Sequence, residues 1–395
     1  MLICGKLYYP YSSVPVAASS LPWRHIGITI SQEVCRPFLP QADMTRVLLV
    51  GGGLTSALTS ALLRRELPHA ELVLWDKAQG AGGRMSTSRS PHDPNCLADL
   101  GAQYISATPE YAKLHKSYYD ELLGAGVLVP LTSHVEGMRT SEEGTTHYVT
   151  PKGTSSIVKH FIREASLTPK FKHHVSSIDW QDGRWSVKTQ SGEADVFDVV
   201  VLTMPVPQVL GLTGTIKELI DKDEKLLSDL KSVEYSSRYA LGLFFEEGAQ
   251  VSLKDEGTAA QYITSNPVAR FIALDNKKRA AGSPSVVLHT SVPFGKVNVD
   301  KTPDEVKPVL LQCIKDMYPH WPQPKAVKCQ KWKFSQVTSA FPGLPGSLTL
   351  ADGLVVGGDG FTHSNMDGCI ESAKAVAEAV AQYVNSKESN LSCKL

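Results

Sequence analysis

The chain has 395 residues, of which 42% are hydrophobic, and it carries 40 acidic and 40 basic residues, so its formal net charge is zero. This length allows two domains, because single cores usually stop growing near about 250 to 300 residues. The charge balance argues against nucleic-acid and acidic-membrane partners. We also expect no transmembrane helix, because no apolar run reaches about 18 residues.

The N-terminal 43 residues show no helical or strand periodicity, and 8–22 are rich in Pro, Ser, Ala and Val. They make a poor transit peptide, and we expect residues 1–43 to be a disordered extension. If Met44 were the start, 47–63 would resemble a secretory signal. Its cleavage would remove the first strand and the phosphate turn described below, so we expect this segment to be retained and favour a cytoplasmic location.

The cysteines and histidines give no metal-ligand pattern. The seven cysteines are scattered and include no C-x-x-C pair, which argues against a zinc site and a disulfide framework. The twelve histidines show no H-x-x-x-H or similar spacing. We therefore predict that the protein binds no metal.

The first predicted element is an apolar strand at 47–50, which runs into Gly51 and Gly53 and then into a helix predicted over 55–65. Such a turn binds a pyrophosphate, because glycines let the backbone approach the phosphates and the helix N-terminus favours negative charge. The third glycine of the usual G-x-G-x-x-G pattern is replaced by Ser56, so the match is imperfect.

A second strand, predicted at 71–75, ends at Asp76, 25 residues after the first glycine of the turn. A carboxylate at this distance takes the ribose hydroxyls of a dinucleotide. Gly83 and Arg84 follow within a Gly-Gly-Arg motif, which a nicotinamide dehydrogenase does not need but a tightly bound FAD does. The pattern predicts FAD, with Arg84 at the pyrophosphate and Lys77 as a further contact.

The remaining elements predict an α/β fold in which a second domain is inserted into a Rossmann-like domain. Further helices are expected at 111–125, 155–165, 303–317 and 367–384, and further strands at 171–180, 184–189, 197–203, 239–245, 269–273, 285–290 and 354–357. Val175, in one of these strands, is another candidate cofactor contact.

Alternating strand patterns within 206–325 predict a mixed or antiparallel sheet. The expected division is a discontinuous FAD-binding domain at 44–115, 150–205 and 326–388, a substrate domain at 116–149 and 206–325, and a disordered tail at 389–395.

The strand at 354–357 closes on a Gly-Asp-Gly sequence that contains Asp359 and Gly360. Both are predicted to contact FAD, which would extend from the glycine turn to this second motif. Asp359 would take a ribityl hydroxyl or a phosphate-linked water. The N-terminus of the last helix would direct its positive end at the pyrimidine edge of the flavin and stabilise the reduced ring.

Motifs that are typical of one known family occur between Met44 and the C-terminus, namely Leu74–Lys77, Gly82–Met85, Asp99–Ile105, Thr203–Pro207, Tyr235–Gly242, Gln261–Pro267, Asp275–Arg279, Lys331–Trp332, Ser335–Val337 and Gly357–Phe361. By these motifs the chain resembles the renalase family from Met44 to the C-terminus. The resemblance implies a p-hydroxybenzoate-hydroxylase-like topology, a fold similar to the flavin amine oxidases and a non-covalent FAD. By the family pattern, Thr55, Arg84, Gln103 and Tyr104 contact this FAD.

The resemblance also implies an oxidase of isomeric dihydronicotinamides, which carry the hydride at ring carbon 2 or 6 or have the α-anomeric sugar. Hydride would pass to flavin N5 and then to O2, giving NAD(P)+ and hydrogen peroxide. Hydride loss from a dihydropyridine needs no general base, so stacking the ring on the flavin and excluding water suffices. We predict Tyr239, Trp332 and Phe334 as pocket walls and expect a monomer or weak dimer.

Several roles stay open at this point. Arg238, Arg270 and Asn276 are candidates for holding a carboxamide or a phosphate, although the pattern favours a surface or structural salt bridge for any one of them. Lys331 is a candidate for assisting oxygen reduction, against a solvated charge at a strand end. One alternative function is amine oxidation, often with a cysteine-linked flavin, but Cys369 opens a helix and is poorly placed for that link. Another is a secreted signalling protein in which catalysis is incidental.

Overall fold

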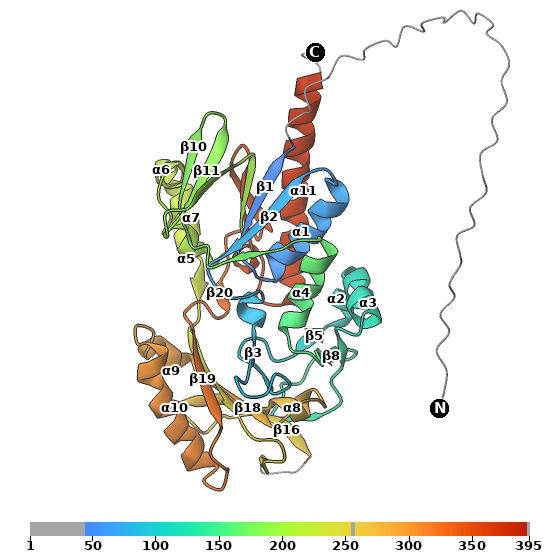
Figure 1. The fold of residues 1–395 in the computed structure, drawn as a ribbon, viewed down its shortest axis with the longest axis vertical. Coiled ribbons are helices and arrows are strands. Elements are labelled where there is room, and N and C mark those ends of the chain that lie inside the picture. Colours follow the sequence, from blue (N-terminus) through green and yellow to red (C-terminus); the bar gives the residue numbers. More distant parts are fainter. Residues whose placement is uncertain (1–43, 254–256, 393–395) are drawn as a thin grey trace, which may run out of the picture. The chain divides into compact units, whose positions relative to one another are not determined.

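The computed structural model describes residues 44–253 and 257–392, so the predicted extension at 1–43 lies outside the described residues. Its first lobe, here the parallel-sheet lobe, is built on a six-stranded sheet (Figure 1). From edge to edge the strands are β21 (Ser347–Ala351), β22 (Leu354–Gly357), β13 (Val199–Leu202), β1 (Arg46–Val50), β2 (Glu71–Asp76) and β9 (Lys170–Phe171). All are parallel except β21. The carboxyl ends of the parallel strands therefore meet at one edge, where open α/β sheets bind ligands.

Three helices cover one face of this sheet: α1 (Leu54–Glu66), α4 (Ser155–Glu164) and α11 (Met366–Ser392). Fully buried Ala57 and Ala373 lie in the core shared by these helices, and α11 lies along α1, from the other end of the chain (Figure 1). Because α11 continues to Ser392, the predicted disordered tail is helical over 389–392, and 393–395 lie outside the described residues.

The other face carries a three-stranded sheet and three short helices. These are β10 (Val175–Gln181), β11 (Arg184–Thr189), β12 (Ala194–Phe197), α5 (Val206–Val209), α6 (Thr215–Lys222) and α7 (Glu224–Lys231). Trp75, Phe197 and Ile216 belong to one buried cluster that joins them to the main sheet. Residues 206–231 therefore belong to the parallel-sheet lobe rather than to the predicted substrate domain.

The second lobe, here the antiparallel-sheet lobe, contains another six-stranded sheet. Its order is β19 (Ala326–Trp332), β15 (Arg238–Phe244), β18 (Ser285–Thr290), β17 (Ala269–Leu274), β16 (Thr258–Tyr262) and β7 (His134–Glu136). All pairs are antiparallel except β16 with β7. The helices α9 (Val292–Val297) and α10 (Pro303–Met317) pack on one face. A capping box between Thr302 and Glu305 fixes the start of α10 at the predicted residue 303.

The two faces of β15 follow the alternation of a strand. Tyr239 and Leu241 belong to the cluster under α9 and α10, whereas Ala240 and Phe244 pack with Ala98 on the opposite face. This opposite face meets the hairpin of β3 (Thr87–Arg89) and β4 (Leu97–Asp99) from the parallel-sheet lobe. We call it the lobe-facing side of the antiparallel sheet.

The predicted boundaries differ from the structure where pairing is long-range. Residues 326–332 were expected in the FAD-binding domain, but they form β19, which pairs along its whole length with β15. Residues 116–124 were expected in the substrate domain, but α3 (Lys116–Gly124) buries Tyr119 and Leu122 in the core of α1 and α4. The predicted helix at 111–125 is divided at His115 into α2 (Pro109–Leu114) and α3.

The remaining elements are short. They are η1 (Gly83–Met85), β5 (Ile105–Ala107), β6 (Val129–Pro130), β8 (Thr146–Val149), β14 (Glu234–Tyr235), α8 (Asp275–Lys278), β20 (Val337–Ser339) and η2 (Asp359–Phe361). Among the described helices, none combines the length and apolar character needed to cross a membrane. Within 44–253 and 257–392, no cluster of three or more His, Cys, Asp or Glu side chains is arranged to hold a metal ion.

Candidate functional site

The glycine turn after β1 leaves an open cradle before α1. Gly51 has φ +117°, and a Cβ there would lie 2.7 Å from the Thr203 hydroxyl, so only glycine fits. Gly53 is the N-cap of α1 and provides no side-chain cap for the first-turn amides, and a Cβ built on it meets no atom within 4 Å. Uncapped amides in front of open space are the arrangement that accepts a phosphate group.

Asp76, at the carboxyl end of β2, braces this turn. Its carboxylate accepts hydrogen bonds from the backbone amides of Gly52 and, at 2.5 Å, of Ala78. The adjacent Lys77 donates to the side chain of Gln208 at 2.8 Å. The predicted acid thus lies beside the phosphate turn, while Lys77 is directed to α5.

Arg84 and Asp359 join two motifs that are 275 residues apart in the sequence. The Arg84 guanidinium makes two hydrogen bonds of 2.5 Å to the Asp359 carboxylate, which also accepts from Ser364. Asp359 is only 3% exposed, so the ion pair satisfies a buried charge. Arg84 and Asp359, which were both predicted to contact FAD, therefore form an ion pair with each other.

The backbone around this ion pair is closely packed. A Cβ on Gly101 would lie 1.8 Å from the Arg84 carbonyl oxygen, and one on Gly360 would lie 2.7 Å from the Tyr235 hydroxyl. The Arg84 guanidinium lies 5.9 Å from the centroid of the Tyr235 ring. The segment η1 with Arg84 (here the Arg84 loop), residues 100–104 (here the Gly101 loop) and η2 consequently pack closely against one another.

Thr55 and Cys369 lie beside the ion pair, at the starts of α1 and α11. Burial is the main cause that raises the pKa of the Cys369 thiol to about 11, with a further contribution from the charge of Asp359, although a hydrogen bond with Thr55 opposes the shift. A thiol with this pKa stays protonated at neutral pH, whereas the thiolate is the nucleophile. The structure thus offers no support for a covalent link from Cys369 to a flavin.

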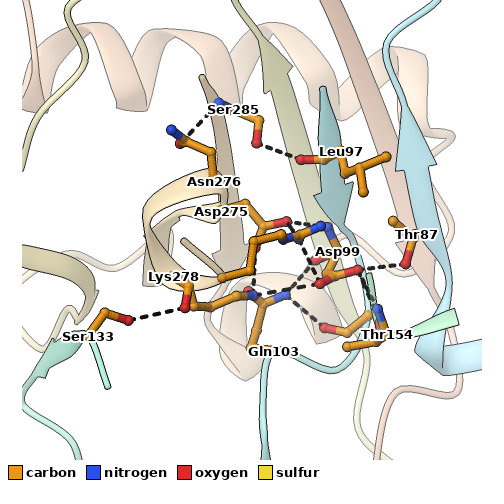
Figure 2. A network of polar contacts seen from close by, with 12 residues as sticks. Thr87, Leu97, Asp99, Gln103, Ser133, Thr154, Asp275, Asn276, Lys278 and Ser285 are labelled. Carbon is orange, nitrogen blue, oxygen red and sulfur yellow. Dashed lines mark hydrogen bonds and ion pairs between the residues drawn. The ribbon is translucent and has the colours of Figure 1, made fainter. Parts of the chain in front are cut away.

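A buried network of charged side chains connects the Gly101 loop to α8 (Figure 2). Asp275 pairs with Lys278 at 2.5 Å and with Arg279, and Arg279 also pairs with Asp99 at 2.8 Å. All four side chains are at most 2% exposed, and burial, together with the charge of Asp275, raises the pKa of Asp99. Burial opposes the charged form of Asp275, but Lys278 and Arg279 hold its pKa below the usual value.

Gln103 takes its orientation from this network. Lys278 donates to its side-chain oxygen at 3.0 Å, and the Gln103 amide nitrogen donates to the carbonyl of Asp99 and, at 3.0 Å, to that of Gly101. The same nitrogen lies 3.2 Å from Nε2 of His289, on the lobe-facing side of the antiparallel sheet. Gln103 is therefore fixed between the two lobes.

Aromatic side chains next to Gln103 extend the contact between the two lobes. The hydroxyls of Tyr104 and Tyr262 are 2.5 Å apart, and the Tyr262 ring packs edge to face on Phe271 with centroids 4.9 Å apart. Burial is the main cause that lowers the pKa of His289 to about 3, and the charges of Arg238 and Lys278 add to it. His289 is accordingly a neutral hydrogen-bonding group at physiological pH.

This shift predicts how activity depends on pH. Because His289 is neutral above about pH 4, its ionisation should leave the rate of flavin reduction unchanged between about pH 5 and 8. Its unfolded-state pKa is near 6.5, so the unfolded chain binds the proton first and stability should fall as pH drops below about 6.5. Rapid-reaction rates for the native enzyme and His289→Asn test this. A step in the native profile that His289→Asn abolishes would contradict it.

The structure separates the three predicted pocket walls. Trp332 lies on the lobe-facing side and donates from its indole nitrogen to the Leu100 carbonyl at 2.6 Å. Phe334 packs edge to face on Tyr235, with centroids 5.6 Å apart, and so lies near Arg84. Tyr239 is 1% exposed on the opposite side of the sheet, where its hydroxyl donates to the carbonyls of Asn298 and Lys301.

Three other candidates also lie away from the site. Lys331 pairs in register with Tyr239 and donates to the carbonyls of Val299 and Lys301. The side chain of Asn276 accepts from the Ser285 amide at 3.4 Å (Figure 2). Val175 is buried in the hydrophobic cluster that contains Trp75. We therefore give no role in the chemistry to Tyr239 or Lys331.

Tyr262, Lys278 and His289 were not predicted as site residues from the sequence. They lie in ordinary strand and turn patterns, and the first two were noted only as members of the motifs that carry the family resemblance. Only the sheet register brings them together, since His289 pairs with Ala240 and with Phe271 on neighbouring strands. The one available signal was the charge-rich Asp275–Arg279 segment after an apolar strand.

The glycine turn, the uncapped amides of α1 and the adjoining Arg84 loop fit an FAD, whose pyrophosphate would lie at the start of α1. Gly51, Gly53 and Thr55 would hold the pyrophosphate end. Gln103 and the start of α11 would contact the ring end. The residues present thus suit the predicted cofactor without any covalent attachment.

Comparisons with known proteins agree with this arrangement. A family model for flavin-containing amine oxidoreductases matches residues 115–381, and one for an NAD(P)-binding Rossmann-like domain matches residues 49–122. Mouse renalase is 46% identical over 348 residues, which cover 86% of this chain and all of that protein. A crystal structure of an Exiguobacterium protein, provisionally named a protoporphyrinogen oxidase, has a TM-score of 0.64 at 14% identity and covers 86% of this chain and 99% of its own.

These matches confirm the predicted α/β fold with a Rossmann-like nucleotide-binding domain. The distant crystal structure shows the fold alone. The mouse protein and the amine-oxidoreductase model show the relationship, because they extend over most of the chain. The chain belongs to the renalase family of flavin-dependent oxidoreductases, and FAD is its cofactor.

Proposed function

We propose that the protein is an oxidase of isomeric dihydronicotinamide dinucleotides, namely 2-dihydro, 6-dihydro or α-anomeric NAD(P)H, and that it forms NAD(P)+ and hydrogen peroxide. The bound FAD supplies a hydride acceptor at N5 that O2 can reoxidise. The resemblance to renalases suggests this substrate class. The charge and chemistry of the lobe-facing side of the antiparallel sheet support it.

The residues near Gln103 are suited to orienting a ring and excluding water. Trp332, Tyr104 and Tyr262 supply aromatic surface, and His289 is neutral because of its low pKa. The nearby carboxylates of Asp99 and Asp275 are engaged by Lys278 and Arg279, so neither is free as a base. Hydride loss from a dihydropyridine requires no base, since the ring nitrogen drives it, and the site is consistent with that chemistry.

The observation that carries the proposal is the positive charge of this side of the sheet. Arg238 and Arg270 lie close enough that the charge of Arg270 lowers the pKa of Arg238, after the larger effect of burial. In the described residues, neither is paired with a carboxylate within 4.0 Å. A catecholamine is a cation at neutral pH and would be repelled, whereas a dinucleotide carries negative phosphates.

Product analysis tests the proposal. The FAD-loaded protein is incubated with 6-dihydro-NAD in air, and O2 consumption, hydrogen peroxide and NAD+ are measured together. We expect the three quantities to be equal and dopamine to give none of them. Peroxide formed from dopamine, with no NAD+ formed from 6-dihydro-NAD, would replace the proposal with amine oxidation.

We also propose that residues 47–63 remain in the mature protein and that it works in the cytoplasm. These residues supply β1, the strand between β2 and β13, together with most of α1. Their removal as a secretory signal would delete the phosphate cradle. Mass spectrometry of the native protein should detect peptides from this segment in the cytosolic fraction. A mature protein that lacks these peptides in every fraction would contradict retention, and their presence outside the cell alone would contradict the location.

A further inference from the structure

Arg238 and Arg270 form a pair of cations at the edge of the candidate site. Arg238 lies in β15 directly opposite Trp332 of β19, two residues from Ala240, which pairs with His289. Arg270 lies in β17 at a register irregularity, and its guanidinium is 5.8 Å from the centroid of the Tyr262 ring. Arg238 is therefore close in the sheet to His289, which lies beside Gln103. Arg270 lies beside Tyr262, whose hydroxyl contacts that of Tyr104.

The partners of these two arginines are neutral. Arg238 donates to the side-chain oxygen of Gln336 at 3.2 Å, and Arg270 donates to the carbonyl of Ile263 at 3.2 Å. The Nε atom of Arg238 is buried and has no acceptor. Along 44–253 and 257–392, no carboxylate lies within salt-bridge distance of either guanidinium.

The same lobe shows how buried cations are usually satisfied. Lys278 and Arg279 are matched by the two carboxylates of Asp99 and Asp275. Arg238 and Arg270 are half-buried, and the charge of Arg270 acts unfavourably on Arg238, so a partly desolvated cation here has no carboxylate among the described residues to offset either cost. Since guanidinium groups remain protonated, the arginine pair can gain most from an external anion, and their planar forks match phosphate oxygens.

We propose that Arg238 and Arg270 bind the pyrophosphate of the dinucleotide substrate, so that the enzyme recognises the nucleotide as well as the nicotinamide ring. This inference rests on the proposed function, because it assumes a dinucleotide substrate. It adds a specificity determinant: phosphate contacts hold the substrate while aromatic groups such as Trp332 adjoin the ring. The pyrophosphate of FAD is accounted for separately by the cradle at the start of α1.

Two variants test the pair, Arg238→Gln and Arg270→Gln, each assayed with 6-dihydro-NAD and with phosphate-free 6-dihydronicotinamide riboside. Loss of a charge-assisted contact to phosphate should raise KM for the dinucleotide about 10- to 100-fold, while kcat changes little. Activity with the riboside should stay at the native level, because it has no phosphate to lose. Titration of the oxidised holoenzyme with NAD+ should show a similar loss of affinity.

Lys328→Gln is the matched control, because it removes one positive charge from an exposed position of β19. It should leave both substrates and NAD+ affinity unchanged. Equal losses with the dinucleotide and the riboside would assign the arginines a structural role and overturn the inference, as would loss of FAD from the purified variants. If the native enzyme oxidises neither substrate, the proposed function fails, and unchanged NAD+ affinity in the variants would separately refute the anion site.

Discussion

Replacing Arg84 by alanine is expected to give a protein that retains no FAD after purification. Asp359 is 3% exposed and takes both of its 2.5 Å charge-assisted contacts from Arg84, so the variant would leave a buried carboxylate without its partner. Breaking such a pair costs about 3–5 kcal/mol. The loss falls where the Arg84 loop, the Gly101 loop and η2 meet, which is where we expect FAD to bind.

The measurement is the ratio of FAD to protein, together with the thermal midpoint of the FAD-free form. Arg46→Ala is the matched control, since Arg46 makes a two-point contact with Asp195 in the same lobe, at 2.9 and 3.1 Å, but lies at the start of β1. It should lower the midpoint and leave the FAD ratio intact. Full FAD content in Arg84→Ala would show that the ion pair does not organise the site.

The second large effect is expected for Asp275→Asn, which should lower the free energy of unfolding by about 3–5 kcal/mol. The substitution keeps the side-chain volume but leaves Lys278 and Arg279, both at most 1% exposed, with Asp99 as their single carboxylate. Lys278 also holds Gln103, so FAD affinity should fall with stability. Urea unfolding of the native protein and the variant, with and without added FAD, gives both quantities.

The control for this prediction has the same spacing at the surface. Asp304 and Lys307 also form an ion pair three residues apart, at 2.7 Å, but the Asp304 side chain is 87% exposed. Exposed pairs contribute about 0–1 kcal/mol, so Asp304→Asn should hardly change the unfolding midpoint. Comparable effects of the two substitutions would mean that the buried network contributes little to stability.

Much of the parallel-sheet lobe could be predicted because its signals are local. The apolar run at 47–50, the glycine turn and the acid at the end of β2 lie within thirty residues, and each has its own physical reason. The bounds of β18, which has an alternating strand pattern, and those of α10 were likewise predicted correctly.

Long-range pairing explains what the sequence could not show. The residues of β19 alternate weakly, and only their register with β15 places Trp332 and Arg238 together. A strand also has two faces, and nothing local to Tyr239 tells which one meets the other lobe. The arginine pair was only one of several options in the sequence, since its significance depends on which carboxylates lie nearby.

The central claim is that this site takes a hydride from an anionic dihydronicotinamide and not from a cationic amine. Anaerobic rapid mixing of the FAD-loaded protein with 6-dihydro-NAD, and separately with dopamine, tests it most directly through the visible absorption band of the flavin. The account predicts bleaching within milliseconds to seconds by 6-dihydro-NAD and an unchanged band with dopamine. Bleaching by dopamine alone would contradict both the proposed chemistry and the role assigned to the charge of the site.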